Sequence, residues 1–207
     1  KQYISVNGKE LISYTLNVFQ QCNLVNEIVV AAQPDYFELL ENIKQRDKIL
    51  KLSNVVKGGL KRQTSVYNAM KSLDAEDEDL IIVHDAARPL LPLNLLTNAI
   101  KSAKKFDNIV VALKAKDTLV KGDSTIEEYI ERDDIYYVQT PQIFRYKILI
   151  DAMIKAENEN FLGTDESMLV KRASYKINII EGSSLNFKIT TNSDLDLFRL
   201  IVNIGTY

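Results

Sequence analysis

The stretch IIVHDAARPLL, residues 81–91, decides the fold, because a buried strand ends there and a polar loop begins at once. Residues 81–83 are apolar and β-branched, which is typical of a strand covered on both faces. His84, Asp85, two alanines and Arg88 follow without a spacer. Open α/β sheets bind ligands beyond the carboxyl ends of their parallel strands. The stretch therefore predicts a binding site at a strand end.

Apolar runs like this one recur along the chain, at residues 27–32, 52–56, 79–83, 108–113 and 176–180. Amphipathic segments lie between the early runs. Their apolar faces are formed by Leu11, Tyr14, Thr15, Val18 and Phe19; by Phe37, Leu40, Ile43 and Ile49; and by Leu93, Leu96, Ile100 and Ala103. Strands that alternate with helices predict an α/β fold with a Rossmann-like, mostly parallel sheet and helices on both faces. Most of these apolar residues are expected to form the core.

Residues 114–140 break this pattern, because they alternate loosely and contain a KGDS turn at residues 121–124. We predict a projecting β-arm on an otherwise single domain that covers residues 1–207. Such an arm leaves Leu119, Ile126 and Ile130 without a core of their own. A second copy of the chain would cover them, so we expect a homodimer through the arm.

The composition narrows the function classes. The chain has 207 residues, 46% of them hydrophobic, and a net charge of −2, so no global field attracts nucleic acid or an anionic membrane. No apolar run reaches the length of a membrane-spanning helix. Cys22 is the single cysteine, which fits a reducing cytoplasm and allows no internal disulfide. One histidine and one cysteine also exclude a structural zinc site.

Two strand ends could carry chemistry. The run at 52–56 leads into Gly58 and Gly59, whose freedom to adopt positive φ would bring the backbone close to a ligand, with Ser65 in the first turn of a helix over residues 62–73. On this stretch alone a plain strand-to-helix turn with Ser65 in solvent is favoured, since Gly-Gly pairs are common in turns. In the second stretch Asp85 is an oxygen ligand suited to Mg²⁺. The alternative is that Asp85 caps the next helix.

The neighbours of Asp85 favour a site. Ala86 keeps the wall of the site low, and Arg88 can bind an anion or brace the loop by pairing with a carboxylate. His84 is expected to be packed and hydrogen-bonded rather than catalytic.

Further along, GTDES at residues 163–167 predicts a helix cap by Thr164 or Asp165. Lys188 lies between apolar neighbours and could aim a fixed charge into a pocket, or simply reach solvent. Ser193 or Asp194 is expected to cap the last helix.

Six motifs occur in one order: GGxxRxxSV at 58–66, VHDAARP at 83–89, KDT at 116–118, an arginine separated by seven residues from TPQ at 132–142, TDE at 164–166 and NxKIT at 186–190. Together they resemble the 2-C-methyl-D-erythritol 4-phosphate cytidylyltransferases of the non-mevalonate isoprenoid route. The likeness extends over the whole chain, since residues 1–19 are similar to the segment that follows the family's nucleotide loop.

The resemblance implies roles for individual residues. Asp85 would hold Mg²⁺ against the triphosphate of CTP, with Ala86 beside the ribose. Gly58, Gly59 and Ser65 would bind the cytosine. Lys1 and Lys188 would stabilise the α-phosphate in the transition state. The methylerythritol phosphate would be bound by Arg88, Thr118, Arg132, Thr140 and Thr164, with Thr118 and Arg132 reaching the site of the partner subunit.

The chain departs from the family upstream, because the family begins with a strand and a glycine-rich loop that ends in PKQ, and this chain starts at Lys1. We therefore expect that strand and loop to be absent from the residues given. Two alternatives stay open at this stage. One is a ribitol 5-phosphate cytidylyltransferase, a family whose corresponding motif usually has Val at the position of Ala87. The other is a non-catalytic nucleotide-binding homologue.

Overall fold

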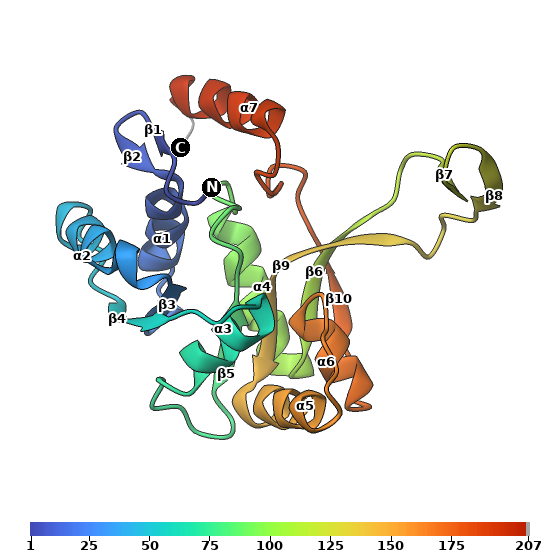
Figure 1. The fold of residues 1–207 in the computed structure, drawn as a ribbon, viewed down its shortest axis with the longest axis horizontal. Coiled ribbons are helices and arrows are strands. Elements are labelled where there is room, and N and C mark those ends of the chain that lie inside the picture. Colours follow the sequence, from blue (N-terminus) through green and yellow to red (C-terminus); the bar gives the residue numbers. More distant parts are fainter. Residues whose placement is uncertain (206–207) are drawn as a thin grey trace.

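The apolar run at residues 79–83 forms strand β5 (Leu80–Val83) in a computed structural model that describes residues 1–205. β5 is an edge of a four-stranded sheet with the order β10-β6-β9-β5. The other strands of this sheet are β6 (Ile109–Lys114), β9 (Tyr136–Arg145) and β10 (Asn178–Glu181). β3 (Ile28–Ala32) and β4 (Leu52–Lys57) form a separate parallel pair. Figure 1 shows the mixed α/β arrangement.

The expectation of a mostly parallel sheet is only partly correct. β10 runs parallel to β6, but β9 is antiparallel to both of its neighbours, β6 and β5. The reason is the connection between β6 and β9. The chain leaves β6, builds the arm and returns directly, without the helical crossover that a parallel neighbour requires.

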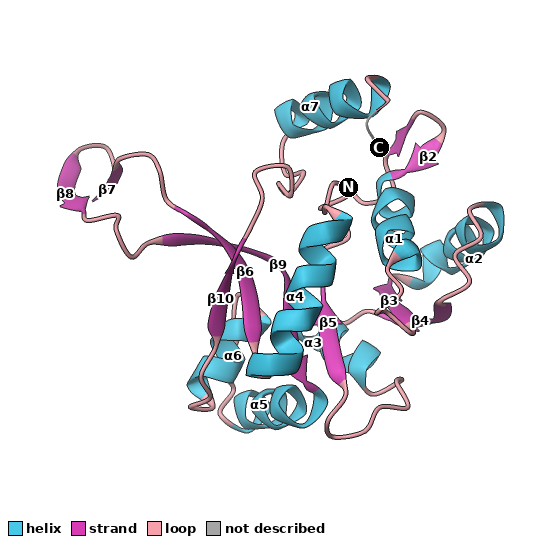
Figure 2. Cartoon of the chain, turned by 180° about the vertical axis from the view of Figure 1, so that it is seen from behind, coloured by secondary structure: helices cyan, strands magenta, loops and turns pink. Residues whose placement is uncertain are grey.

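Seven α-helices are described in residues 1–205 (Figures 1 and 2): α1 (Leu11–Gln21), α2 (Phe37–Arg46), α3 (Arg62–Met70), α4 (Leu93–Phe106), α5 (Tyr146–Asn158), α6 (Glu166–Arg172) and α7 (Asn192–Asn203). A 3₁₀ turn (Pro34–Tyr36) precedes α2, and a small hairpin of β1 (Ser5–Val6) and β2 (Lys9–Glu10) precedes α1. α3 ends three residues earlier than expected. Ile49 is buried but lies beyond the end of α2, so it does not belong to that helical face.

Helices cover both faces of the four-stranded sheet. Consecutive β9 residues Ile143 and Phe144 point to opposite faces, and each belongs to a different apolar cluster. Ile143 packs with α4, whereas Phe144 packs with α5 and α6. Helices on both faces, as expected from the sequence, are therefore found.

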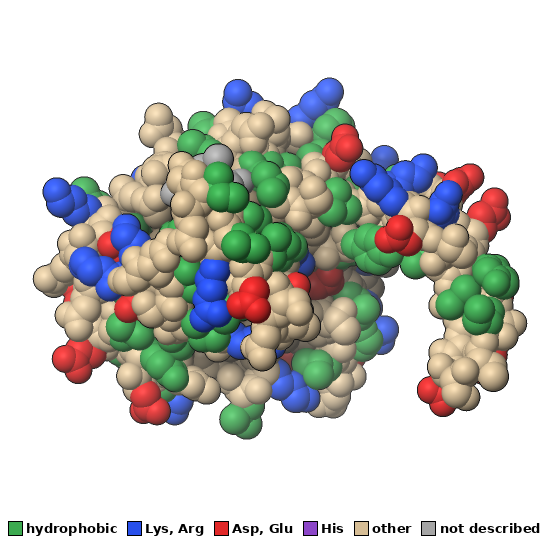
Figure 3. Space-filling view, turned by 90° about the horizontal axis from the view of Figure 1, so that it is seen from above, with side chains coloured by type: hydrophobic (Ala, Val, Ile, Leu, Met, Phe, Trp, Pro, Cys, Tyr) green, Lys and Arg blue, Asp and Glu red, His purple; other side chains and the backbone are tan. Residues whose placement is uncertain are grey.

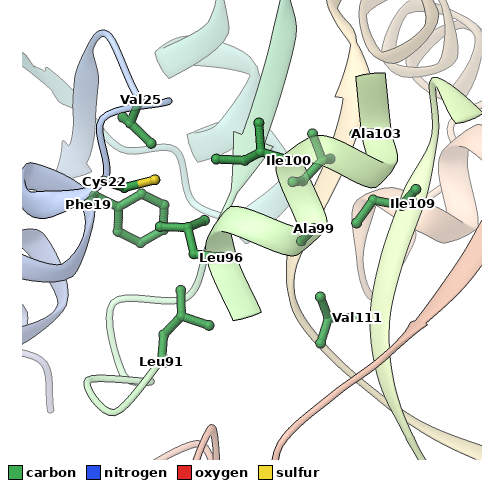
Figure 4. Packing of buried hydrophobic residues seen from close by; sticks show 11 residues of the cluster. Phe19, Cys22, Val25, Leu91, Leu96, Ala99, Ile100, Ala103, Ile109 and Val111 are labelled. Carbon is green, nitrogen blue, oxygen red and sulfur yellow. The ribbon is translucent and has the colours of Figure 1, made fainter. Parts of the chain in front are cut away.

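Helix α4 joins the sheet to the N-terminal part of the chain (Figure 4). Its residues Leu96 and Ile100 are buried among Phe19, Cys22 and Val25, which lie on α1 and the loop after it. The same cluster includes Ile109 and Val111 of β6 together with the α4 residues Ala99 and Ala103. This packing holds the β3–β4 pair next to the main sheet.

A cavity of about 970 Å³ lies where β3 and β5 would otherwise meet. Its lining includes residues 28–31 of β3 and all of β5, together with apolar side chains of α1 and α3. Among the described strands, β3 pairs only with β4 and β5 only with β9. Each of the two strands therefore turns an unpaired edge toward this slot.

Residues between β6 and β9 project from the body of the molecule (Figures 1 and 2). At the tip, β7 (Leu119–Gly122) pairs with β8 (Ile126–Ile130) in antiparallel fashion. Apolar side chains are exposed there, including Tyr129 at 68% and Ile126 at 56%. Figure 3 shows green apolar side chains gathered on the projection. Among residues 1–205, none of the helices is long and apolar enough to cross a membrane.

Candidate active site

The carboxylate of Asp85 is the centre of a cluster of three cationic side chains. Lys188 Nζ lies 2.8 Å from Asp85 Oδ2, Arg62 Nε lies 3.2 Å from Oδ1, and Arg88 Nε lies 3.7 Å from Oδ2. Asp85 follows β5 directly, so the strand delivers the carboxylate to the end of the sheet. The large cavity also reaches this point, since Ser65, Asp85 and Lys188 line it. The sequence prediction of a site at this strand end is supported by this geometry.

The surroundings keep Asp85 charged. Burial on its own would raise the pKa of this carboxyl, but the hydrogen bond from Lys188 and the charges of Arg62 and Lys188 outweigh it and lower the pKa. With three cations and two carboxylates, Asp85 and the Glu166 that pairs with Arg62, the cluster has one positive charge in excess. Such a cluster suits a polyanionic ligand, for which charge-assisted hydrogen bonds are strong.

His84 and Thr140 fix the loop around Asp85 by hydrogen bonds. His84 Nδ1 is 3.0 Å from the hydroxyl of Thr140, and that hydroxyl accepts a hydrogen bond from the backbone N–H of Asp85 at 3.1 Å. The other ring nitrogen, Nε2, is 3.2 Å from the carbonyl oxygen of Arg88. Burial lowers the pKa of His84 to about 4, so the ring is neutral at pH 7. The prediction that His84 is packed and hydrogen-bonded is confirmed.

The segment that carries Lys188 is tied to the same loop. Buried Arg88 donates from Nη1 to the carbonyl of Asn186 at 2.7 Å, and Asn186 Nδ2 donates to the carbonyl of Thr140 at 2.7 Å. The N–H of Ile189 donates to the carbonyl of Ala87 at 2.8 Å. Arg88 thus braces the loop, which was one of its two expected uses. These bonds place Lys188 over Asp85.

Lys1 reaches the same region from the start of the chain. Its Nζ donates a hydrogen bond to the carbonyl of Thr190, two residues after Lys188. Lys1, which the resemblance assigns to the α-phosphate together with Lys188, is therefore bonded to the segment that carries Lys188.

Gly58 and Gly59 are needed for close packing and not for positive φ, which neither has. A Cβ on Gly59 would lie 2.4 Å from the Cβ of Thr64, and one on Gly58 would lie 3.2 Å from Ser65 Oγ. The expectation about φ was therefore wrong, because the turn closes by contact with the first turn of α3. Ser65 Oγ accepts from the N–H of Gly59 at 3.0 Å, so it holds this turn.

The acceptor residues named from the resemblance are not all together in one chain. Thr164 is exposed in the loop before α6. Thr140 is buried and its hydroxyl is engaged by His84 and Asp85. Thr118 and Arg132 are exposed on the projecting arm, where Arg132 donates to the carbonyl of Lys116. The arm residues therefore do not join the Asp85 cluster of their own chain.

Some residues at the site were missed in the sequence. Arg62 pairs with Asp85 and with Glu166, and Gln142 Nε2 donates to Asp165, the N-cap of α6, at 2.9 Å. Arg62 stands within the GGxxRxxSV motif, so the motif could have indicated it as a site residue. Its pairing with Glu166, 104 positions away, has no local sequence pattern that could indicate it.

A metal ion is supported only together with a ligand. Among the described residues no group of three or more His, Cys, Asp or Glu side chains could hold a metal. Asp85 is a single hard oxygen donor, and Mg²⁺ in proteins is often held by one or two carboxylates with substrate phosphates. Asp85 fits that arrangement and not an all-protein metal cage.

The glycine turn at the end of β4, the acid at the end of β5 and the surrounding lysines and arginines, set on an open α/β sheet, define a nucleotidyltransferase. Comparison with known proteins gives the family. The family model described as 2-C-methyl-D-erythritol 4-phosphate cytidylyltransferase matches residues 1–203, and the chain belongs to this family.

Relatives and solved structures agree with this assignment. The chain is 37% identical to the enzyme of that name from Lysinibacillus sphaericus over 94% of this chain and 84% of the relative. It is 37% identical to that from Clostridioides difficile over 99% of this chain and 86% of the relative.

Two solved structures show the same fold. The 4-diphosphocytidyl-2C-methyl-D-erythritol synthase from Anaerococcus prevotii has a TM-score of 0.87 at 27% identity, with 97% of this chain and 89% of that chain covered. A bifunctional protein from Campylobacter jejuni has a TM-score of 0.75 at 29% identity, and the match covers 95% of this chain and 48% of that one.

Proposed function

We propose that this chain transfers CMP from CTP to 2-C-methyl-D-erythritol 4-phosphate, giving 4-diphosphocytidyl-2-C-methyl-D-erythritol and pyrophosphate. The observation that carries the proposal is the placement of Lys188, Arg62 and Arg88 around Asp85 at the end of β5, in a chain that belongs to the cytidylyltransferase family. The family match favours methylerythritol phosphate over ribitol 5-phosphate as acceptor and favours an enzyme over a non-catalytic homologue.

In the proposed reaction an oxygen of the acceptor phosphate attacks the α-phosphorus of CTP, and the bond from that phosphorus to the β-phosphate oxygen breaks. Lys188 and Lys1 are proposed to stabilise the negative charge that grows on the α-phosphate. Because the protein supplies fixed charges and positions the two reactants, little other chemistry is required of it. Pyrophosphate takes the bonding electron pair when it leaves.

Binding of CTP is assigned to the two strand ends. The glycine turn at Gly58 and Gly59, held by Ser65, is proposed to bind the cytosine through backbone groups. Ala86 leaves room for the ribose. The hydrogen bond from Thr15 Oγ1 to the carbonyl of Ala86, at 2.9 Å, supports this by fixing the wall of the site to α1.

Asp85 is proposed to hold Mg²⁺ together with the triphosphate, where the ion would neutralise phosphate charge. Chelation by EDTA is then expected to abolish turnover. Asp85→Asn should raise the Mg²⁺ concentration needed for half-maximal rate, measured by pyrophosphate release. An unchanged Mg²⁺ requirement in this variant would argue against Asp85 as the ligand.

The acceptor is assigned to Arg88, Thr140 and Thr164 of one chain and to Thr118 and Arg132 of a second chain. Support comes from the arm, whose apolar side chains are exposed and whose Thr118 and Arg132 lie away from the Asp85 cluster of their own chain. We therefore propose a homodimer in which each arm completes the site of its partner. A cytoplasmic location is also proposed, supported by the single cysteine, Cys22.

We further propose that an upstream strand of the same protein fills the slot between β3 and β5. The unpaired edges of both strands and the apolar lining of the cavity support this, because a strand there would pair on both sides and complete a continuous sheet. The glycine-rich loop expected from the resemblance would then follow at the same end of the sheet as Asp85.

The deciding experiment measures pyrophosphate release from CTP and Mg²⁺ by the full-length protein, with methylerythritol 4-phosphate and ribitol 5-phosphate offered separately. We expect turnover with methylerythritol 4-phosphate alone. Turnover with ribitol 5-phosphate alone would show that the acceptor assignment is wrong, and no turnover with either would leave a non-catalytic homologue.

A further inference from the structure

Two adjacent residues at the start of α3 connect the nucleotide side of the site to the loop that carries Thr164. Arg62 Nη1 donates to both carboxylate oxygens of Glu166, at 2.7 Å each, while Arg62 Nε contacts Asp85. Gln63 accepts from the N–H of Gly163 at 3.0 Å and donates to the carbonyl of Phe161 at 3.3 Å. The loop is thus attached to α3 on both sides of Thr164.

The ion pair at the centre of this connection is largely removed from water. The side chain of Glu166 is 1% exposed and that of Arg62 is 35% exposed. A buried carboxylate without a partner is strongly destabilising, so Glu166 depends on Arg62 in the folded state. Two apolar residues of matched size could fill the same space at little cost in stability. The charged pair is therefore not required for packing alone.

The position of Glu166 in the chain connects the ion pair to the loop that carries Thr164. It is the first residue of α6 and follows Thr164 by two positions. The next turn of this helix is anchored in the core by Leu169, which is 1% exposed, and a Cβ on Gly163 would lie 2.6 Å from Leu169. The loop is therefore closely packed against α6, and a shift of Glu166 would move Thr164 with it.

We infer that Arg62 and Glu166 are positioning residues that set the distance between the acceptor loop at Thr164 and the nucleotide site at Asp85. The inference rests on the proposed roles of Asp85 and Thr164. A misplacement of about 1 Å between reacting groups can cost about 10²-fold in rate, which is why such a brace matters.

The test compares Glu166→Gln with the parent protein in steady-state kinetics. Glu166→Gln keeps the shape but loses the charge, so the KM for methylerythritol 4-phosphate should rise about tenfold and kcat should fall about tenfold, with the KM for CTP changed less than about twofold. Glu159→Gln is the matched control, because it removes the partner of Arg172 at the other end of α6. Its kinetic constants should equal those of the parent.

A purely structural role is separated by the double variant Arg62→Met with Glu166→Leu. Removal of both charges should restore the urea midpoint that either single variant loses. If the pair positions the loop, the raised KM for the acceptor should persist in the double variant. Recovery of that KM, or an unchanged KM in Glu166→Gln, would overturn the inference.

Failure of the proposed function gives a different result. A parent protein that turns over normally while Glu166→Gln keeps its KM overturns only the inference. A parent protein that binds CTP in calorimetry but neither sugar phosphate overturns the function and the inference together.

Discussion

Lys188 is the residue whose contacts must change most during the proposed reaction, because in the free protein its ammonium is held 2.8 Å from Asp85. When a triphosphate with Mg²⁺ binds, this ion pair would be replaced by two new contacts. Asp85 would bind the metal, and Lys188 would bind the α-phosphate. In the free protein the ion pair with Asp85 thus holds the Lys188 ammonium at the site until the ligand binds. Its side chain is 42% exposed, so a ligand that arrives from solvent can reach it.

Lys188→Met should therefore lower kcat by about 10²- to 10³-fold, similar to the loss of one oxyanion donor. The KM for CTP should change much less, because the charge acts mainly on the transition state. Pyrophosphate release gives both constants. Lys101→Met, which alters an exposed lysine of α4, should be indistinguishable from the parent. A large rise in KM with unchanged kcat would place Lys188 in ground-state binding instead.

At the scale of elements, the start of α7 has the side-chain cap that the sequence predicts, but at a different residue. Ser193 or Asp194 was expected to cap this helix. The structure shows Thr191 as the N-cap: its hydroxyl accepts from the N–H of Asp194, and the Asp194 carboxylate accepts from the N–H of Thr191. Asp194 is thus the third residue of a capping box, a role that the same short sequence permits.

Thr191→Ala should lower the free energy of unfolding by about 1 kcal/mol, because it removes the cap. Ser193→Ala is the matched control and should change it by less than about 0.5 kcal/mol, as an ordinary surface substitution does. Urea unfolding followed by circular dichroism measures both. A larger loss for Ser193→Ala would mean that the cap lies where the sequence suggested.

The arm is the element that should separate the two substrates. Arg132→Ala is expected to raise the KM for methylerythritol 4-phosphate about tenfold or more, as loss of a charge-assisted hydrogen bond does, and to leave that for CTP nearly unchanged. Lys121→Ala, at the end of β7, is the control for a lost arm charge. Equal effects of Arg132→Ala on both substrates would contradict an acceptor site borne by the arm.

The sequence predicted the strands and helices because each depends on periodicity within one segment. It singled out Asp85 because an apolar strand-like run ends there, and Lys188 because it stands between two apolar residues. It could not predict the antiparallel entry of β9 or the bond between Arg62 and Glu166, since both arise from contacts between distant segments. The φ values of Gly58 and Gly59 were also missed, because glycine permits either sign of φ and the need for glycine here comes from close contact with Thr64 and Ser65.

For the whole molecule, the arm predicts that activity belongs to the dimer. When Arg132→Ala and Lys188→Met proteins are mixed and exchange subunits, the arm of each chain should enter the site of the other. One site of each mixed dimer then carries both substitutions and the other carries neither. Random exchange should restore about a quarter of the parent activity, since half of the dimers are mixed and half of their sites are intact.

Sedimentation velocity gives the oligomeric state in the same samples. Ile126→Lys with Tyr129→Lys should weaken association, because it places charges on exposed apolar positions of β8. No gain of activity on mixing, with dimers present, would mean that each arm serves its own chain.

The slot between β3 and β5 has a consequence for amide hydrogen exchange. Alternate N–H groups of a strand point to opposite sides, so half of the amides of β3 and of β5 point toward the slot, where no described strand accepts them. In residues 1–205 alone these amides should exchange far faster than those of β9, which is paired on both sides. With an upstream strand in place they should become as slow as their neighbours. Exchange rates that alternate residue by residue along β5 would therefore reveal an open slot, and uniform protection would reveal that it is filled.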